Sequence, residues 1–304
     1  MTTKIRLSIL IASACFILIQ WTACESGSKT VNRSPVDYVN PYVGNISHLL
    51  VPTYPTIHLP NSMLRVYPER ADYTSDFIAV TSHRGSSAFN LSPIQTSDKL
   101  NRVVRYSYDN EVITPYSYYV YLDQLNINVD YAPSYQAGIY KIGFEKNGDN
   151  KLIVNTRNGE LTTDGRSVSG YQIIDNTPTR IYLYLESEQK PDNVGVLSEG
   201  GLDLSSQKGA TMVLEFGNQQ TINVRYGISF ISSEQAKNNL RRDISTYDVG
   251  KVADVGRKIW NETLNKIQIE GGSDDEKSLF YTSLYRTYER MINISEDGKY
   301  YSAF

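Results

Sequence analysis

Apolar and polar residues alternate strictly in several short segments between about Asn40 and Phe230. In these segments every second residue is apolar, and the residues between them are polar or glycine. A period of two predicts β-strands with one face on a core and the other in solvent, as in antiparallel sheets. The apolar positions of the clearest segments are Leu125, Ile127, Val129 and Tyr131; Tyr140, Ile142 and Phe144; Ile181, Leu183 and Leu185; and Ile222, Val224, Tyr226, Ile228 and Phe230.

Turn dipeptides separate these segments. The strongest are Asn147-Gly148, Asn158-Gly159 and Asp164-Gly165, because Asn, Asp and Gly tolerate the left-handed backbone of tight hairpin turns. Many short strands with frequent turns and little helix predict a large β-sandwich. We therefore expect a mainly β fold, with a large antiparallel β-sandwich over residues 36–231 and C-terminal linker helices over residues 232–304.

After Phe230 the hydrophobic period changes from that of strands to that of helices. One helix is predicted to begin at Ser233, and a second to span Asp248–Leu264 with an apolar stripe along one side. Between the second helix and the last one, Lys266–Glu270 predicts a short strand that ends at Gly271-Gly272.

The last helix is predicted in most detail. Ser273 and Glu276 form a capping box, which begins a helix from Asp274 to about Met291. Its apolar residues cover most of its circumference, as is typical of a helix buried on all sides, and only thirteen residues follow Met291. A missing C-terminal domain, a second subunit or the sandwich itself could cover it, and we favour the missing domain. The chain alone is then expected to expose apolar surface around Tyr281, Leu284, Tyr285 and Tyr288.

The first 23 residues predict an export signal. Lys4 and Arg6 precede an apolar stretch, Leu7–Ile19, that is too short to span a bilayer. The following Trp21-Thr22-Ala23-Cys24 resembles a bacterial lipobox, in which Cys24 becomes the lipidated first residue. The alternative is a signal-anchor helix followed by an incidental Cys.

Cys15 is a weaker candidate for lipidation, because cleavage there would divide the apolar stretch. Loss of Cys15 with the signal would leave the mature chain without a disulfide. Residues 24–35 predict a short flexible tether. We therefore expect a protein of the bacterial cell envelope, anchored by lipid in the outer membrane or at the periplasmic face.

Composition narrows the possible partners. The net charge of −3, with no basic patch, gives the chain no electrostatic reason to bind nucleic acid or an anionic membrane surface. Tyrosine is unusually frequent, at 24 copies against 8 phenylalanines. A tyrosine ring suits both sugars and sheet surfaces, and its preference for strands explains most of these copies.

The three histidines fall in one stretch, but His48, His58 and His83 are spaced like no standard zinc site. The ordinary interpretation is that these histidines have structural roles or lie at the surface. The alternatives are that they bind a metal or contact sugar hydroxyls. The irregular, proline-containing segment from Asn40 to Pro68 is a candidate binding loop as well as a structural one.

No acid–base pair stands out among the carboxylates. Asp72 and Asp76 lie in the same loop region without a distinctive context, and Asp274, Asp275 and Glu276 are explained by the helix cap and dipole. Nucleophile elbows, P-loops and Gly-x-Gly-x-x-Gly motifs are absent from the sequence. The sequence alone thus contains no recognisable catalytic machinery.

Three segments together resemble glycoside hydrolase family 92. Val39-Asn40-Pro41-Tyr42-Val43-Gly44 is similar to the family's opening motif, and Leu59–Pro68 to its Pro-x-x-Met…Pro segment. Asp275–Arg286 followed by Asp297-Gly298-Lys299-Tyr300 resembles the helix that leads into its catalytic domain. Their order and spacing agree over essentially the whole mature chain.

The resemblance implies an N-terminal β-sandwich joined by linker helices to an (α/α)6 catalytic barrel. Family members are calcium-dependent, inverting exo-α-mannosidases, in which one carboxyl group protonates the leaving oxygen and a second activates water. Those carboxylates and most calcium ligands belong to the barrel, so no catalytic residue or metal ligand is carried over to this chain. The sandwich lends residues to the rim of the active site, for which the candidates are His83, Arg84, Asp72, Tyr73 and Arg65.

Three functions therefore compete. The chain is the front part of an α-mannosidase acting on N-glycans or mannan side chains and lacking its barrel, a carbohydrate-binding lipoprotein without catalysis, or a scaffold for a separate catalytic subunit. The first of these functions, the front part of an α-mannosidase, leaves open whether this chain is itself an enzyme. In each case mannose-containing glycans and the lipid membrane are the expected partners, and nucleic acid is not.

Overall fold

The computed structural model describes residues 33–45, 53–70, 77–83, 89–95, 100, 106–174 and 177–302. The chain divides into two compact units, Met1–Arg33 and Ser34–Phe304. Apart from Arg33, every described residue belongs to the second unit, and the fold given below is that of this unit. The predicted signal and the lipidation candidate Cys24 lie outside the described residues.

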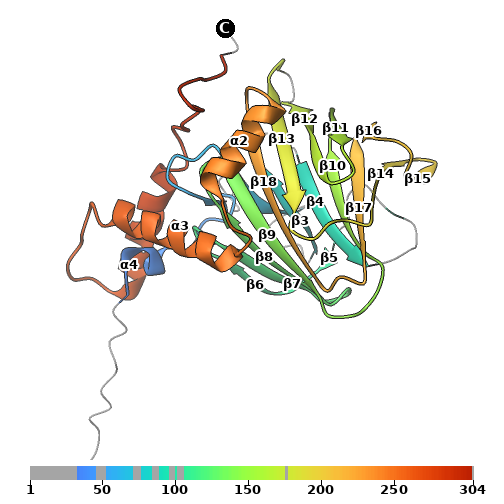
Figure 1. Ribbon diagram of the computed structural model, residues 1–304. Helices are drawn as coiled ribbons and strands as arrows, with labels where there is room; N and C mark the ends of the chain where they lie inside the picture. The colour runs from blue at the N-terminus through green and yellow to red at the C-terminus, as the bar shows by residue number, and fades with distance from the viewer. Residues whose placement is uncertain are drawn as a thin grey trace, which may run out of the picture. The chain divides into compact units, whose positions relative to one another are not determined.

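The described residues form two nine-stranded antiparallel sheets that pack face to face, which confirms the predicted mainly β fold (Figure 1). The strand order of the first sheet is β1-β2-β3-β4-β10-β17-β14-β15, with β5 paired to β3. Its strands are β1 (Ile57–His58), β2 (Arg65–Arg70), β3 (Phe77–His83), β4 (Phe89–Gln95), β5 (Tyr106–Ser107), β10 (Asn150–Thr156), β14 (Asn193–Ser198), β15 (Gly201–Asp203) and β17 (Thr211–Gly217).

The second sheet has the strand order β16-β11-β12-β13-β18-β9-β8-β7-β6. All four segments singled out by alternation belong to it, as β8, β9, β13 and β18. The three turn dipeptides mark connections between consecutive strands, with Gly159 as the first residue of β11. Its strands are β6 (Asp109–Ile113), β7 (Tyr118–Leu122), β8 (Ile127–Pro133), β9 (Ala137–Phe144), β11 (Gly159–Thr163), β12 (Ser167–Ile173), β13 (Arg180–Ser187), β16 (Lys208–Gly209) and β18 (Thr221–Ser229).

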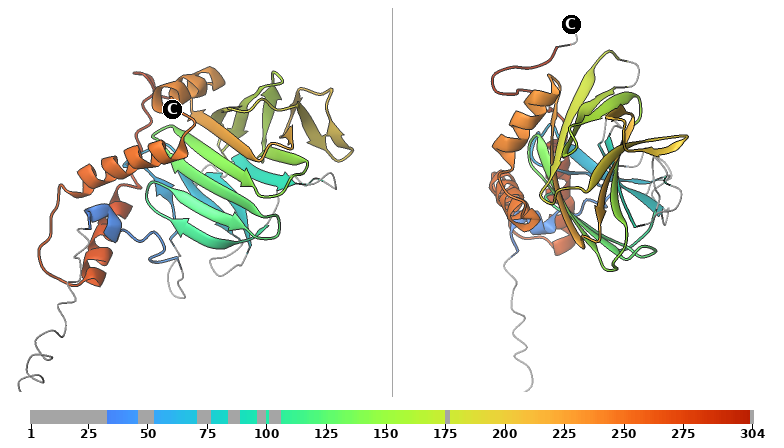
Figure 2. Two further views of the ribbon diagram at one scale, coloured as in Figure 1. Left: turned by 60° about the horizontal axis from the view of Figure 1, so that its bottom comes forward. Right: turned by 45° about the vertical axis from the view of Figure 1, so that its right-hand side comes forward.

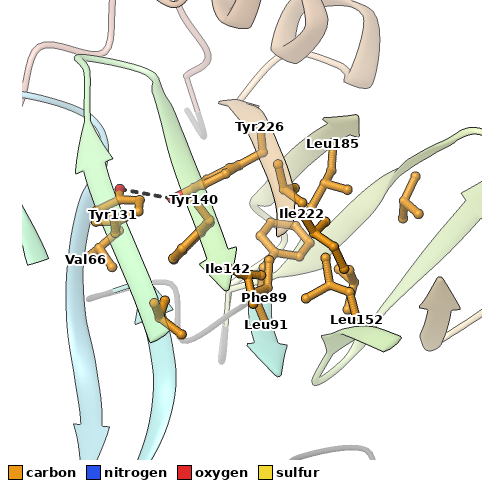
Figure 3. Close-up of a cluster of buried hydrophobic side chains, with 14 of the residues drawn as sticks. Val66, Phe89, Leu91, Tyr131, Tyr140, Ile142, Leu152, Leu185, Ile222 and Tyr226 are labelled. Carbon is orange, nitrogen blue, oxygen red and sulfur yellow. Dashed lines mark hydrogen bonds between the residues drawn. The ribbon is translucent and has the colours of Figure 1, made fainter. Parts of the chain in front are cut away.

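The main core lies between the sheets and is filled by the alternating apolar residues (Figure 3). Each fully buried aliphatic or aromatic side chain contributes about 1.5–3 kcal/mol relative to exposure. Three tyrosines, Tyr131, Tyr140 and Tyr226, lie inside it, and the hydroxyls of Tyr131 and Tyr226 are 3.1 Å apart. Burial raises the pKa of both hydroxyls far above the usual value, so both stay protonated. They form a hydrogen bond with each other inside the core.

Four helical segments accompany the sheets: η1 (Pro35–Tyr38), α2 (Ser233–Asp243), α3 (Val249–Leu264) and α4 (Asp274–Thr287). The predicted starts of α2, α3 and α4 are confirmed, and the predicted capping box of α4 is present.

In two respects the predictions for this C-terminal region are wrong. Residues Lys266–Glu270 form a turn and an irregular segment between two helices instead of a strand. Helix α4 ends at Thr287, where the N–H groups of Tyr288 and Glu289 bond to carbonyls three residues back and tighten the last turn, and Met291 then has a left-handed backbone with φ of 63°. Within the described residues, no helix is both long and apolar enough to cross a membrane.

The second sheet is covered on its outer face by α2 and α3 (Figure 2). Leu240 and Ile244, in and just after α2, pack with Val252 of α3 against Ala137 and Ile139 of β9. This sheet therefore buries apolar residues on both faces, in the sandwich core and beneath the helices.

The closest approach of α2 to the sheet is at Gly227 of β18. A Cβ atom built on Gly227 would lie 2.1 Å from the carbonyl oxygen of Ala236, a backbone atom of the helix. Glycine is therefore required here to let the helix lie directly on the strand.

We predict that Gly227→Ala lowers the free energy of unfolding by about 1–3 kcal/mol, because the added methyl group forces α2 away from β18. Urea denaturation followed by circular dichroism measures the change. Gly143→Ala in β9 of the same sheet is the control, since its Cβ would make only an ordinary 3.7 Å contact with Asn128. Equal stability losses in the two variants would contradict the close-approach explanation.

Candidate functional site

A pocket of about 210 Å³ opens where the sandwich meets α2 and the segment that follows α4. Its wall combines residues from the start of the sandwich, from the β8–β9 turn, from the end of α2 and from the chain after α4. Most of these side chains are polar, which separates this pocket from the apolar core. The lining residues are Asn61, Ser62, Met63, Tyr135, Gln136, Arg242, Asp243, Asn293 and Ser295.

Asn61 fixes one wall of the pocket. Its backbone is left-handed, with φ of 55°, a conformation that asparagine tolerates better than most residues. Its side-chain amide donates hydrogen bonds to the carbonyl oxygens of Arg290 and Met291, both at 3.1 Å. Its own carbonyl oxygen accepts a 2.9 Å bond from the backbone N–H of Asn293. The chain after α4 is thus fastened to the sandwich by its backbone, independently of the side chains it carries.

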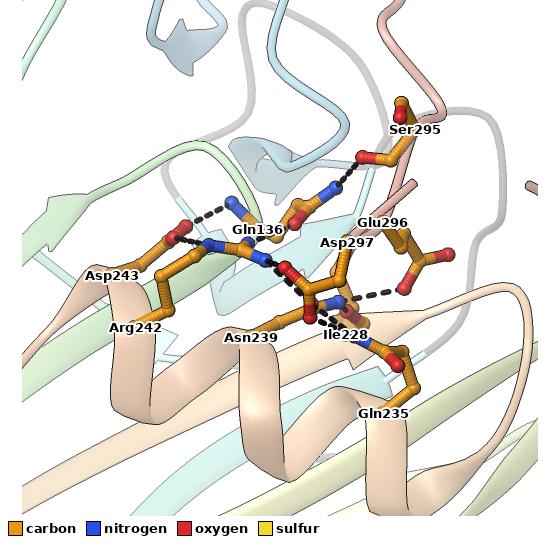
Figure 4. Close-up of polar contacts among 9 residues, drawn as sticks. All are labelled: Gln136, Ile228, Gln235, Asn239, Arg242, Asp243, Ser295, Glu296 and Asp297. Carbon is orange, nitrogen blue, oxygen red and sulfur yellow. Dashed lines mark hydrogen bonds and ion pairs between the residues drawn. The ribbon is translucent and has the colours of Figure 1, made fainter. Parts of the chain in front are cut away.

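Arg242 organises the opposite wall (Figure 4). Its guanidinium donates to Asp243 at 2.9 Å, to Asp297 at 2.6 Å and to the side-chain oxygen of Gln136. Asp243 also accepts a 2.8 Å bond from the backbone N–H of Gln136. Burial would lower the pKa of Arg242, but the two carboxylates outweigh it and hold the pKa above its usual value. The cation is therefore matched by two anions, and this wall carries no surplus positive charge.

A buried carboxylate lies behind this wall. Glu296 is fully buried, and one of its oxygens accepts a 2.9 Å bond from the backbone N–H of Phe230. The other accepts a 2.7 Å bond from the Asn239 amide (Figure 4). The same Asn239 amide donates to the carbonyl oxygen of Ile228 at 2.8 Å. A buried carboxylate is costly unless such donors satisfy it. The segment that carries Glu296 is consequently held against both α2 and β18.

The C-terminal helices form an apolar junction beside the pocket. Trp260 of α3 is fully buried and donates from its indole N–H to the carbonyl oxygen of His58 at 2.8 Å, and the Tyr285 hydroxyl donates to the carbonyl oxygen of Thr56. The His58 ring packs against the rings of both Trp260 and Tyr285, with centroids 5.4 and 4.8 Å away. His58 therefore has a structural role here, as its ordinary interpretation predicts.

This junction corrects the expectation of exposed apolar surface on the last helix. Tyr281 and Tyr285 are only 5% and 0% exposed, and Leu284 and Tyr288 are half-buried. The physical reason is that η1 and α3 fold back over α4, with Val36, Leu59, Trp260 and Leu264 in the same cluster. Large exposure on and after α4 is limited to other residues, among them Leu279 at 60% and Met291 at 87%.

The five predicted rim residues are only partly placed by the structure. Arg65 is half-buried in β2, where its guanidinium donates to the carbonyl oxygen of Glu289 at 3.2 Å. His83 ends β3, and its backbone pairs with Val66, the neighbour of Arg65. The backbones of Arg65 and His83 are thereby brought onto adjacent strands. Asp72, Tyr73 and Arg84 and the side chain of His83 lie outside the described residues, so their predicted role stays a prediction.

Calcium needs six to eight oxygen ligands, usually including several carboxylates. In the described ranges, no three His, Cys, Asp or Glu side chains come together in a group that could hold a metal ion. The two carboxylates at the pocket, Asp243 and Asp297, are already engaged by Arg242. The described residues therefore do not fit the calcium ion that the resemblance implies, and no step is assigned to it.

Comparison with known proteins identifies the family. The model of the glycosyl hydrolase family 92 N-terminal domain matches residues 38–229, which is more than half of the chain. The chain belongs to glycosyl hydrolase family 92. The model of the family 92 catalytic domain matches residues 235–304, which include α2, α3 and α4. The pocket is thus lined from both matched regions. No curated protein matches the chain.

Solved family 92 structures share this fold. The inverting mannosidase BT2199 from Bacteroides thetaiotaomicron VPI-5482 superposes with a TM-score of 0.76 and is 25% identical; the match covers 86% of this chain and 40% of that protein. The α-mannosidase BT3965 from Bacteroides thetaiotaomicron superposes with a TM-score of 0.76 at 16% identity, over 87% of this chain and 42% of that one. A structure of BT3965 in complex with mannoimidazole has a TM-score of 0.73 at 17% identity, over 84% and 40%. The chain thus spans about two fifths of the length of these proteins.

The pocket residues were missed by sequence reasoning. Gln136 lies in a β-turn and Arg242 at the end of a helix, positions where polar residues are common and carry no signal. The one usable hint was Asp297-Gly298, which the family resemblance singled out and which lies next to Glu296.

We predict that Asn239→Ala lowers the free energy of unfolding by about 1–3 kcal/mol, because it leaves the buried Glu296 carboxylate without one of its donors. Urea unfolding monitored by tryptophan fluorescence gives the value. Asn238→Ala is the matched control, since Asn238 is the exposed neighbour on the same helix and should change stability by less than about 0.5 kcal/mol. An Asn239→Ala variant as stable as its control would show that Glu296 does not depend on this bond.

Proposed function

We propose that this chain supplies the N-terminal sandwich and linker helices of an exported glycosidase that hydrolyses α-mannosides of N-glycans or mannan side chains. The observation that carries the proposal is the pair of family 92 matches, which run from the sandwich into the start of the catalytic domain. The similarity to an inverting mannosidase at 25% identity supports mannose as the sugar. In this proposal α2, α3 and α4 hold the sandwich in a fixed position beside the (α/α)6 barrel.

The chemistry of inversion explains why we assign no catalytic residue to this chain. An inverting glycosidase uses a carboxylic acid and a carboxylate base about 6.5–9.5 Å apart, with room between them for the sugar and a water. Around the pocket, Asp243 and Asp297 are paired with Arg242, and Glu296 is enclosed by Asn239 and the backbone. Carboxylates held by fixed donors in this way are poor proton carriers. We therefore place the acid and the base in the barrel of the proposed enzyme.

The role proposed for the sandwich is to form part of the substrate rim. The candidates are those that the family resemblance implies, His83, Arg84, Asp72, Tyr73 and Arg65. The β2–β3 pairing supports two of them, because it brings the backbones of Arg65 and His83 onto adjacent strands. Arginine and histidine suit this role, since both donate hydrogen bonds to sugar hydroxyls.

A second candidate function is glycan binding without cleavage. It is favoured by the burial of Tyr281 and Tyr285, because a self-sufficient binding protein needs its last helix covered by its own residues. A scaffold that docks a separate catalytic subunit is the related alternative, and the exposed Leu279 and Met291 would suit such docking.

We predict that the purified 304-residue chain releases no mannose from yeast mannan or from an aryl α-mannoside, with or without calcium, because the carboxylate pair of an inverting enzyme lies elsewhere. Chromatography of free mannose measures the outcome, with BT2199 as the positive control. Measurable turnover by the chain would refute our assignment of catalysis to the barrel. Saturable binding of mannose-terminated glycans on an array without any turnover, lost in the His83→Ala, Arg84→Ala double variant, would favour the second function.

We also propose that the protein is anchored in the cell envelope through a lipid on Cys24. The support is the sequence alone: a basic start, a short apolar stretch and a small residue before the Cys. Such an anchor would keep the glycosidase close to glycans at the cell surface.

We predict that Cys24→Ser abolishes incorporation of a radiolabelled fatty acid into the protein in bacterial cells, because the thiol is the acceptor of the lipid. Autoradiography of the purified protein and its recovery in the membrane fraction test this. Cys15→Ser is the control and should be labelled like the native chain. Labelling that persists in Cys24→Ser would exclude Cys24 as the anchor.

A further inference from the structure

We propose that the pocket between Asn61, Tyr135, Arg242 and Asn293 binds a single neutral sugar residue. This site goes beyond the proposed hydrolysis, because binding there requires no bond to be cleaved. The proposal rests on the size of the pocket, the pairing of its charged groups and the hydrogen-bonding groups that face it.

The size of the pocket limits the ligand. Pockets that hold drug-sized molecules have volumes of about 300–1,000 Å³, whereas this one has about 210 Å³. A ligand that fits is therefore smaller than a typical drug molecule, of the order of one six-membered ring with its substituents. A longer glycan would have to place one residue in the pocket and extend the others into solvent.

The ion pairs of the wall disfavour ionic ligands. Arg242 is paired with both Asp243 and Asp297, so an anion would have to displace a carboxylate from the guanidinium. A cation would in turn have to compete with Arg242 for the same two carboxylates. The two carboxylates outnumber the one guanidinium, so the wall repels anions, and its carboxylates are already engaged against cations. The pocket therefore favours a neutral ligand.

The polar groups of the wall favour a ligand with several hydroxyls. The Gln136 amide is held by Arg242 and by its 2.9 Å bond to the carbonyl oxygen of Ser295, so its orientation is fixed before a ligand arrives. The Asn293 side-chain oxygen accepts a 2.9 Å bond from the Ser295 N–H, which orients the side-chain amide of this exposed residue. Fixed donors and acceptors in close succession match a sugar, in which each hydroxyl both donates and accepts.

Tyr135 supplies the flat surface that a sugar ring needs. It is 42% exposed at the tip of the β8–β9 turn, where its carbonyl oxygen accepts a 3.0 Å bond from Leu64 N–H and fixes the backbone. Burial, together with the nearby Asp243 and Glu262, raises the pKa of its hydroxyl, which therefore stays a hydrogen-bond donor at neutral pH. An amphipathic ring of this kind can stack on the apolar face of a sugar and bond to its edge.

The test is a titration of the 304-residue chain with methyl α-mannoside, methyl α-glucoside and methyl β-galactoside. Saturation-transfer difference NMR measures the binding at each step of the titration. We expect saturable binding of at least one of them. Asn293→Ala should weaken this binding about three- to tenfold, the effect of one lost hydrogen bond. Tyr135→Ala should weaken it more than Tyr135→Phe, because only the former removes the stacking surface.

Two controls make the outcome decisive. Tyr300→Ala removes a tyrosine that is 69% exposed and outside the pocket lining, and Asn238→Ala removes an exposed asparagine on α2; both should bind like the native chain. The proposal is overturned if none of the three glycosides binds, or if Asn293→Ala and Tyr135→Ala bind as tightly as these controls. Slower amide hydrogen exchange of residues 291–295 on addition of the bound glycoside would support it, and exchange slowed only elsewhere would overturn it. Mannose release by the chain would refute the proposal that catalysis belongs to the barrel. It would leave the proposal of a sugar-binding pocket unaffected.

Discussion

The second sheet is apolar on both faces, and most of the structure follows from the need to bury them. One face packs into the sandwich core, and the other, at Ala137 and Ile139, would be exposed without a cover. The chain supplies that cover itself through α2 and α3, with Gly227 allowing the helix backbone to touch the strand. A sandwich with only one core would need no such helices. The connection from sandwich to helices is therefore part of the folded unit and not a flexible linker.

Once the helices are placed, the chain that follows α4 has to return across the end of the sandwich. Polar interactions fix its course: Asn61 holds its backbone, Arg242 holds Asp297, and the buried Glu296 is satisfied by Asn239. Because an unsatisfied carboxylate in the interior is costly, this arrangement discriminates strongly against other paths for the chain. The polar pocket is the space left between these fixed contacts, and its shape is determined by them.

The elements with strong periodicity could be predicted from the sequence. The alternation in β18 and the capping box of α4 each have one physical interpretation, and both are confirmed. Prediction from the sequence failed where the outcome depends on distant partners. The burial of Tyr285 requires Thr56 and Trp260, which are remote in sequence, and nothing in the helix itself predicts them. The same holds for the pocket, since Gln136 and Arg242 become neighbours only through the packing of α2 on the second sheet.

The contacts of the N-terminal segment are unusually long in sequence, and this affects how the protein is made. Asn40 bonds to Thr282, the carbonyl of Pro41 accepts from Arg286, and His58 accepts from Trp260. Residues 35–61 are synthesised early in translation, and their partners follow more than 200 residues later. The opening segment cannot complete its native contacts until α3 and α4 have been translated. Since synthesis proceeds at about 5–20 residues per second, this delay lasts on the order of ten seconds or more.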